Sequence, residues 1–264
     1  MYICVGLVLG FRHIFKPQNV SRQFGEIVKM KHKMKKIFLI FISYYILISC
    51  AVTHHKKDLI DFKINKIPEN KLKLDGYYYR EFESDMDWEN PPYHYKKYIT
   101  ETGITKFKTL NSLFIYSDGF TFVLSGIDGL SNYYCAEGII FENSYENAHR
   151  NIQLMIEAQK SKDKKLRRRC DFEPDYINNK GLTEIIGDKI RIQHYQAEMQ
   201  IPDKDSFNSY YLYEMNGIIK NDTTFVINEI KNYRTDSIIK VNYIYKFRRN
   251  IQKPEISNYF KKHM

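Results

Sequence analysis

Pairs of short aromatic or β-branched runs, separated by two-residue turn motifs, place the strongest constraint on the fold of this 264-residue chain. The clearest pair lies in SLFIYSDGFTFVLSG, where residues 114–116 and 120–124 flank Asp118-Gly119. An Asp-Gly pair tolerates the positive φ of a tight hairpin turn, and aromatic residues suit a pleated, half-buried surface. The pattern predicts an antiparallel hairpin.

The same pattern recurs along the second half of the chain. Gly187-Asp188, Asn216-Gly217 and Asn221-Asp222 are expected to be turns between further strands. The expected strands, including the first pair, are residues 114–116, 120–124, 183–186, 190–195, 210–214, 217–220, 224–229 and 238–247. Strands so close together, with so little chain between them, predict a mainly β fold.

One segment has helical spacing instead. Its apolar residues fall on one stripe, and they are Ala148, Ile152, Met155 and Ile156. We expect one longer helix over about residues 143–169, with Asn143 as its N-cap and Glu146 reaching back to the cap amide. The basic run 160–169 suits the negative end of the helix dipole. Two interpretations of that run stay open, a solvated helix end and a contact with anionic headgroups or nucleic acid.

These motifs, in this order, resemble lipocalin-like lipoproteins of unknown function from Gram-negative bacteria. The motifs are Leu74-Asp75-Gly76-Tyr77-Tyr78, the hairpin at Asp118-Gly119, IGDKIRI at 186–192, NDTTF at 221–225 and KPEISN at 253–258. The resemblance covers most of residues 74–260. It implies an antiparallel meander forming a lipocalin-like barrel with the helix inserted, and it supplies no catalytic residues. The long helix and the lack of a tryptophan just before Gly181 leave open whether the barrel closes.

Residues 34–50, MKKIFLIFISYYILISC, have the arrangement of an export signal. Two lysines precede thirteen uncharged residues, 37–49, which would span about 20 Å as a helix, short of the ~30 Å hydrocarbon core. An export signal is therefore favoured over a membrane-spanning helix. Residues 1–33 would then be an upstream extension that is not translated, or else a genuine extra segment. We exclude them from the expected fold.

The end of this signal, Leu47-Ile48-Ser49-Cys50, resembles a bacterial lipobox. In that class of signal the cysteine receives a diacylglycerol, the chain is cut between Ser49 and Cys50, and the new amino terminus is acylated, commonly with palmitate. The resemblance implies a stable membrane anchor, since each buried methylene contributes about 0.8 kcal/mol. A signal anchor that merely ends in cysteine is the alternative. Ala51 does not resemble an inner-membrane retention residue, so we expect the outer membrane, with its periplasmic and surface faces both open.

Removal of residues 1–49 changes the charge balance. That part contains eight Lys or Arg and one acidic residue, so the remainder has 33 basic and 30 acidic residues, a net charge of about +3 rather than +10. A nucleic-acid partner loses its main support. Residues 50–72 are polar and are expected to be a lipidated tether, with His54 and His55 solvated, while 73–264 form the β-rich domain.

The cysteines suggest one covalent constraint. Cys4 would leave with the leader and Cys50 would carry lipid, which leaves Cys135 and Cys170. In an exported protein these two can pair, although two buried thiols remain an equal alternative.

Five acidic residues form a candidate calcium site in the sequence. They occupy successive odd positions, so on a strand they share one face, and they are Glu81, Glu83, Asp85, Asp87 and Glu89. Such a face could bind calcium, but no glycine-bearing calcium loop is present. An acidic solvent-exposed face, with Phe82 packed inward, is the favoured interpretation.

No phosphate-binding loop, zinc-protease motif, nucleophile elbow or Cys-x-x-Cys occurs, and no cofactor is implied. His149 and His194 are isolated and are interpreted as surface or satisfied core histidines. We therefore expect no enzyme. The leading hypothesis is a lipid-anchored envelope protein that binds a small apolar ligand or another envelope component. A structural or interaction lipoprotein without a pocket is the alternative, and an unrecognised hydrolase is the least favoured.

Overall fold

The computed structural model describes residues 52–61, 66–85, 93–130, 142–170, 177–198, 209–250 and 252–255. Its strands are β1 (Val52–Thr53), β2 (Gly76–Asp85), β3 (Lys106–Ile115), β4 (Phe120–Asp128), β5 (Lys180–Ile186), β6 (Lys189–Glu198), β7 (Ser209–Asn221), β8 (Thr224–Asn232) and β9 (Ser237–Arg249). Its helices are η1 (Lys56–Asp58), α2 (Tyr93–Thr102), α3 (Tyr145–Lys160), α4 (Lys164–Cys170) and η2 (Ile177–Asn179).

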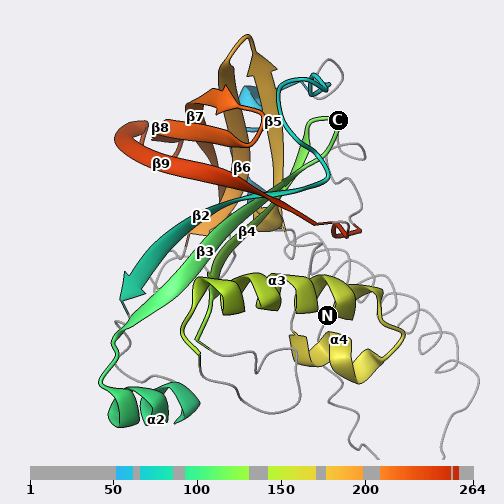
Figure 1. The fold of residues 1–264 in the computed structure, drawn as a ribbon. Helices are drawn as coiled ribbons and strands as arrows, with labels where there is room; N and C mark the ends of the chain where they lie inside the picture. Colours follow the sequence, from blue (N-terminus) through green and yellow to red (C-terminus); the bar gives the residue numbers. More distant parts are fainter. Residues whose placement is uncertain are drawn as a thin grey trace, which may run out of the picture. The chain divides into compact units, whose positions relative to one another are not determined.

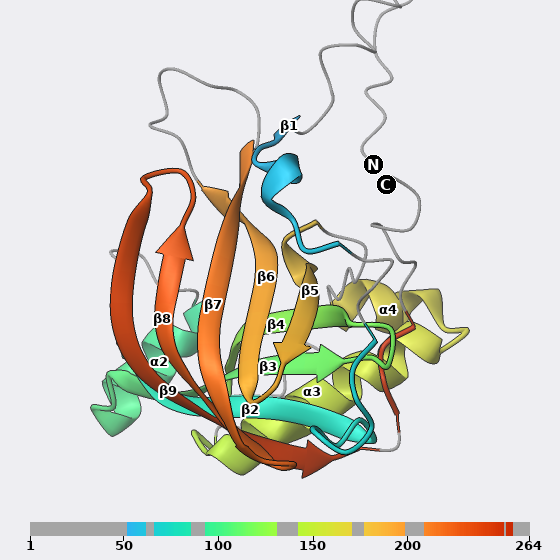
Figure 2. The same cartoon turned by 90° about the horizontal axis from the view of Figure 1, so that it is seen from above.

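The strands β2 to β9 form a closed antiparallel barrel. Each strand pairs with the next one in the chain, and the start of β2 pairs back with the end of β9, so the meander closes (Figures 1 and 2). The expected fold class, mainly β with a lipocalin-like barrel, is confirmed, and the open question of closure is answered. Among the described helices, none combines the length and the apolar character that a membrane span requires.

Three of the four expected turns are present. Gly119 and Gly187 have φ values of 79° and 63°, and the Asn221 side chain accepts a hydrogen bond from the Thr223 amide at 3.0 Å. The expected turn at Asn216-Gly217 is wrong, because β7 runs through it with a shift of register. A Cβ atom on Gly217 would overlap the carbonyl oxygen of Val226. The glycine therefore permits a close approach of β8 at a bulge.

The side chains of the barrel divide into two hydrophobic clusters. The interior cluster draws residues from strands all around the barrel, including Tyr78, Leu113, Ile192, Phe225 and Tyr245. The outer cluster lies between the barrel wall and helix α3, and includes Tyr77, Phe114, Phe122, Ile152 and Ile156. Neighbouring residues such as Tyr77 and Tyr78 thus point to opposite faces of β2, as the period of two requires.

The expected single helix is two helices, and this part of the prediction is wrong. Helix α3 begins at Tyr145, because Ser144 caps it and accepts a hydrogen bond from the Asn147 amide at 3.0 Å. Asn143 instead has φ of 47° and accepts from the Lys108 amide of β3. The helix ends at Lys160, where Ser161 is extended and the Asp163 side chain accepts from the Lys165 amide. Such short polar side chains compete with helical hydrogen bonds, so α4 starts anew.

The apolar stripe predicted for this segment is confirmed, because all four of its residues pack in or against the outer cluster. Ala148, Ile152 and Ile156 are fully buried, and Met155 packs against the same cluster. Figure 1 shows α3 lying across strands β2 to β4. Helix α2, which follows β2, was not expected from the sequence.

The polar segment expected to be a free tether contacts the barrel in its described residues. Strand β1 pairs in parallel with the start of β7. The amide of Ile60 donates to Gln193 Oε1 at 2.7 Å, and the Ile60 side chain is 1% exposed. Ile67 and Leu72 are buried in the interior cluster. Apolar residues that recur among the polar ones therefore hold residues 52–61 and 66–72 on the barrel. The expectation of a free tether is wrong for these residues.

Candidate ligand site

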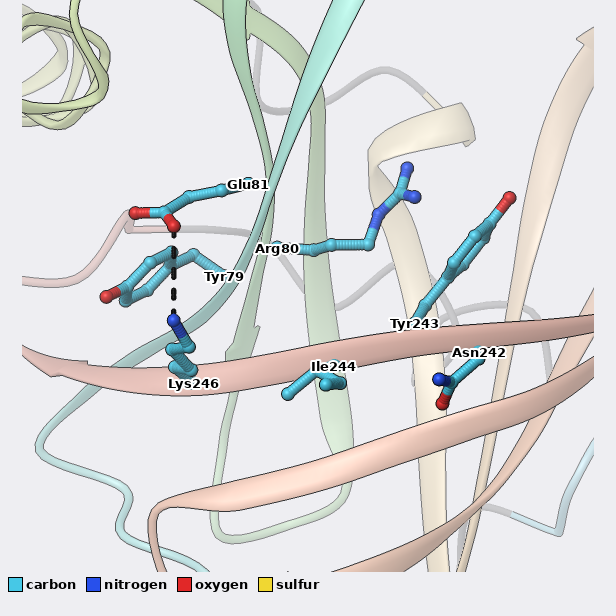
Figure 3. A pocket seen from close by; sticks show the side chains of 7 residues that line it. All are labelled: Tyr79, Arg80, Glu81, Asn242, Tyr243, Ile244 and Lys246. Atoms are coloured by element: carbon cyan, nitrogen blue, oxygen red, sulfur yellow. Dashed lines mark ion pairs between the residues drawn. The ribbon is translucent and has the colours of Figure 1, made fainter.

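The barrel wall opens between β2 and β9. Residues 76–79 of β2 pair with residues 246–249 of β9, and beyond these pairs β2 continues along β3 while β9 continues along β8. The two strands therefore diverge and leave a cavity of about 260 Å³, which we call the window (Figure 3). The window is lined by Tyr79, Arg80, Glu81, Asn242, Tyr243, Ile244 and Lys246.

On the inner side of the window, Arg80 and Tyr243 point the same way (Figure 3). The Arg80 guanidinium carbon lies 3.8 Å from the centre of the Tyr243 ring and 4.5 Å from that of Phe82. Such cation–π contacts each contribute about 0.5–2 kcal/mol. The two rings hold the guanidinium in place at the inner side of the window.

Arg80 has no anionic partner within the described part of the chain. The arginine ion pairs there are formed by other arginines, and the buried Nε atom of Arg80 has no hydrogen-bond partner. The hydroxyl of Tyr245 is a polar group that interacts with Arg80. Burial raises the pKa of Tyr245 to about 12, while the charge and hydrogen bond of Arg80 act in the opposite direction. The guanidinium of Arg80 therefore has an N–H group that is available to donate a hydrogen bond, and it lies beside the cavity.

The outer rim of the window has one weak ion pair. Lys246 Nζ lies 4.0 Å from Glu81 Oε2, and both side chains reach solvent, with exposed fractions of 60% and 34%. An exposed pair of this kind contributes at most about 1 kcal/mol, so it can separate at little cost. Ile244 is on the same face of β9 as Lys246 and is 46% exposed. The rim therefore offers an apolar surface and a second positive charge.

The acidic stripe expected from the sequence is a solvent-exposed face. Glu81, Glu83 and Asp85 are exposed on β2 and alternate with the half-buried Phe82. Lys108 bonds Glu83 and holds the pKa of that carboxyl below its usual range. In the described residues no group of three His, Cys, Asp or Glu side chains could hold a metal ion. The calcium candidates Asp87 and Glu89 lie outside the described residues.

The cysteines are only partly described. Ser49, Cys50 and Cys135 lie outside the described residues. Cys170 ends α4, is 2% exposed and is disulfide-bonded, with its partner among the residues that are not described. The pairing of Cys170 with Cys135 stays a prediction.

Two histidines are buried, His149 on helix α3 and His194 on strand β6. His149 Nδ1 and the Tyr77 hydroxyl share a hydrogen bond of 2.7 Å, and His194 Nε2 lies 3.0 Å from the Gln196 amide nitrogen. Burial lowers the pKa of each to about 4, and for His149 the nearby Arg248 adds to the effect. Both are neutral core residues. His149 fits the expected satisfied core histidine, whereas Nδ1 of His194 is buried without a hydrogen-bond partner. His54 was expected to be solvated, but it stacks on Tyr211 at 4.6 Å.

These two histidines predict acid sensitivity. The unfolded imidazoles take up protons near pH 6.5, whereas the folded ones do so only near pH 4. Stability should therefore fall as the pH drops from about 6.5 towards 4, by up to roughly 3 kcal/mol for each histidine. Urea unfolding across this range measures the loss.

The His194→Gln variant provides the control for this pH dependence. It should show a shallower decline than the wild type over the same pH range, because one of the two buried imidazoles is gone. A wild-type unfolding free energy that stays constant from about pH 7 to pH 5 would contradict neutral burial.

Arg80 and Tyr243 were not expected from the sequence to be site residues. A usable signal existed, because Tyr78, Arg80 and Phe82 alternate with the exposed acidic residues and so share the inner face of β2. An inward-facing arginine is uncommon enough to be singled out. The divergence of β2 and β9, which creates the cavity, has no counterpart in local sequence.

Fold and site together define a closed eight-stranded meander barrel with a cation-bearing opening in its side. Comparison with known proteins finds no matching family model, no matching curated protein and no matching solved structure. The chemistry of the window is therefore the basis for a function.

Proposed function

We propose that this protein is a lipid-anchored binding protein of the bacterial cell envelope, and that its barrel takes a small, largely apolar ligand at the window. The observation that carries the proposal is the cavity of about 260 Å³ with Tyr243, Ile244 and Arg80 in its lining. Ligand sites are concave and mainly apolar, with a few convergent polar groups. The interior beside the window is filled by large side chains such as Tyr78 and Phe225. The ligand therefore lies in the window and not along the barrel axis.

The anchor part of the proposal rests on the export signal and the lipobox ending at Cys50. Strand β1 begins two residues later, at Val52, and is already paired with β7. Two residues span at most about 7 Å, so acyl chains on Cys50 would lie beside this end of the barrel.

The surface around β1 suits a membrane interface. His54 stacks on Tyr211, and the Arg234 guanidinium carbon lies 4.8 Å from the centre of the same ring. Lys231 Nζ lies 4.5 Å from the centre of the Tyr233 ring. Aromatic and basic residues favour the headgroup region of anionic bilayers. We infer that this end of the barrel faces the membrane, with the outer membrane as the proposed location.

A second candidate is an interaction lipoprotein that joins another envelope protein. It is supported by the exposed apolar residues of β9, where Ile238 and Ile239 are 55% and 58% exposed. Crosslinking in cells through residues at these two positions would recover one stoichiometric partner if this alternative holds.

The ligand-binding proposal is tested by identifying molecules that co-purify with the protein. The chain is extracted from membranes in detergent, and bound molecules are analysed by mass spectrometry. Lys246→Trp should block the rim of the window and reduce the recovered ligand. Lys240→Trp is the matched control, since Lys240 is on the same strand, exposed and paired with Glu229. Equal recovery from both variants, or none from the wild type, would count against the proposal.

A further inference from the structure

Arg80 differs from four other described arginines in its partners. Those with a carboxylate oxygen within 4.0 Å are Arg150, Arg191, Arg248 and Arg249. Arg80 is half-buried, as Arg191 and Arg248 are, and like that of Arg191 its Nε atom is out of contact with water. Its neighbours in the described residues are rings and a hydroxyl instead of an acid.

The placement of Arg80 carries a cost that a ligand can offset. A cation that is partly removed from water loses hydration, and without a counter-ion nothing charged replaces that hydration. The faces of the Tyr243 and Phe82 rings attract the guanidinium, which offsets part of the lost hydration. The two rings also keep the guanidinium plane in one orientation. The edges of the guanidinium carry its N–H groups, which are arranged to bind two oxygens of a carboxylate or phosphate at once.

We propose that the window binds the anionic headgroup of a single-chain amphiphile, with Arg80 as the residue that holds the headgroup. This rests on the proposed function and specifies its class of ligand. The headgroup oxygens, of a carboxylate or a phosphate monoester, accept hydrogen bonds from Arg80. The Tyr245 hydroxyl lies beside the same guanidinium and is a second donor for the headgroup.

The size and rim of the window match this ligand. At about 260 Å³, the cavity is smaller than the ~300–1,000 Å³ that encloses a whole drug-sized molecule. It therefore holds a headgroup and the first part of a chain. The remaining chain leaves over Ile244, which is apolar and 46% exposed. Lys246 contributes a second positive charge once its weak pair with Glu81 opens.

Native mass spectrometry of the full chain in a nonionic detergent tests this proposal. The probes are decanoate, decyl phosphate and methyl decanoate, and the last keeps the chain but removes the charge. We expect at least one of the two anions to bind one-to-one and at least tenfold more tightly than the ester. The tighter of the two anions identifies the headgroup. Arg80→Gln should weaken binding of the anions by roughly tenfold to a hundredfold, the range for hydrogen bonds to charged groups, and leave the ester unaffected.

Two further variants separate the effect of positive charge from that of the planar guanidinium of Arg80. Arg80→Lys keeps the charge without the planar fork and should recover only part of the affinity. Lys240→Gln removes an equally positive but exposed charge from β9 and should change nothing. Thermal unfolding of each variant confirms that it is folded.

The outcomes distinguish this proposal from the function on which it rests. If the ester binds as tightly as the acid, or Arg80→Gln changes nothing, Arg80 only packs against its two rings and the proposal is overturned, while apolar binding stands. If none of the three probes binds, the small-molecule function falls together with it.

Discussion

Replacing Cys50 with alanine is expected to abolish incorporation of labelled palmitate. The thiol of Cys50 is the only group in the proposed lipobox that could form a thioether, so the variant would have no attachment point for diacylglycerol. Cleavage before residue 50 should fail as well, because in this class of signal it follows lipid attachment. Metabolic labelling followed by gel analysis measures both effects, since the uncleaved product would be larger.

Cys170→Ala is the matched control for this experiment. Cys170 is buried and disulfide-bonded, so its replacement removes a cysteine that lies outside the proposed lipobox. It should be labelled as strongly as the wild type. Equal label in Cys50→Ala and the wild type would remove the anchor from the account.

The largest loss of stability is expected from Phe114→Ala. Phe114 is fully buried between the barrel wall and α3, and its ring centre lies 4.9 Å from that of Tyr77 and 6.0 Å from that of Phe122. Truncation leaves a cavity bounded by two rigid elements that cannot readily collapse. The expected loss is about 3–5 kcal/mol in the free energy of unfolding.

Chemical denaturation measures this loss, and Ile186→Ala is its control. Ile186 lies next to the turn after β5 and is 68% exposed, so its truncation should cost less than about 0.5 kcal/mol. A Phe114→Ala variant within about 1 kcal/mol of the wild type would show that the outer cluster does not hold α3 on the barrel.

The sequence predicts the local parts of this fold well. The Asp118-Gly119 and Gly187-Asp188 turns and the alternation along β9 follow from backbone sterics and a period of two, which need no distant contacts. Closure between β2 and β9 depends on strands from opposite ends of the domain. The resemblance to lipocalin-like lipoproteins implied a barrel, but only the structure establishes the closing pairs.

The errors lie where tertiary contacts override a local signal. Asn216-Gly217 has the composition of a turn, yet the glycine is there because β8 passes close to it. Asn143 is a good N-cap by type, but its side chain bonds the β3 backbone and leaves the cap to Ser144. Residues 52–61 are polar on average, but Ile60 and its bond to Gln193 hold them on the barrel.

The candidate site could be predicted only in part. Strand periodicity places Arg80 on the inner face of β2, opposite the exposed Glu81 and Glu83. Its lack of a carboxylate partner, and the cavity beside it, depend on where β9 leaves β2. That separation depends on the curvature of the whole barrel, and no short segment encodes it.

The central claim, a binding barrel fixed to a membrane by acyl chains, is tested most directly by the intact mass of the protein purified from membranes. The account predicts a chain that starts at Cys50, carries the added mass of its acyl groups and is released only by detergent. A chain that still contains residues 34–49, or one that is recovered without detergent, would contradict it.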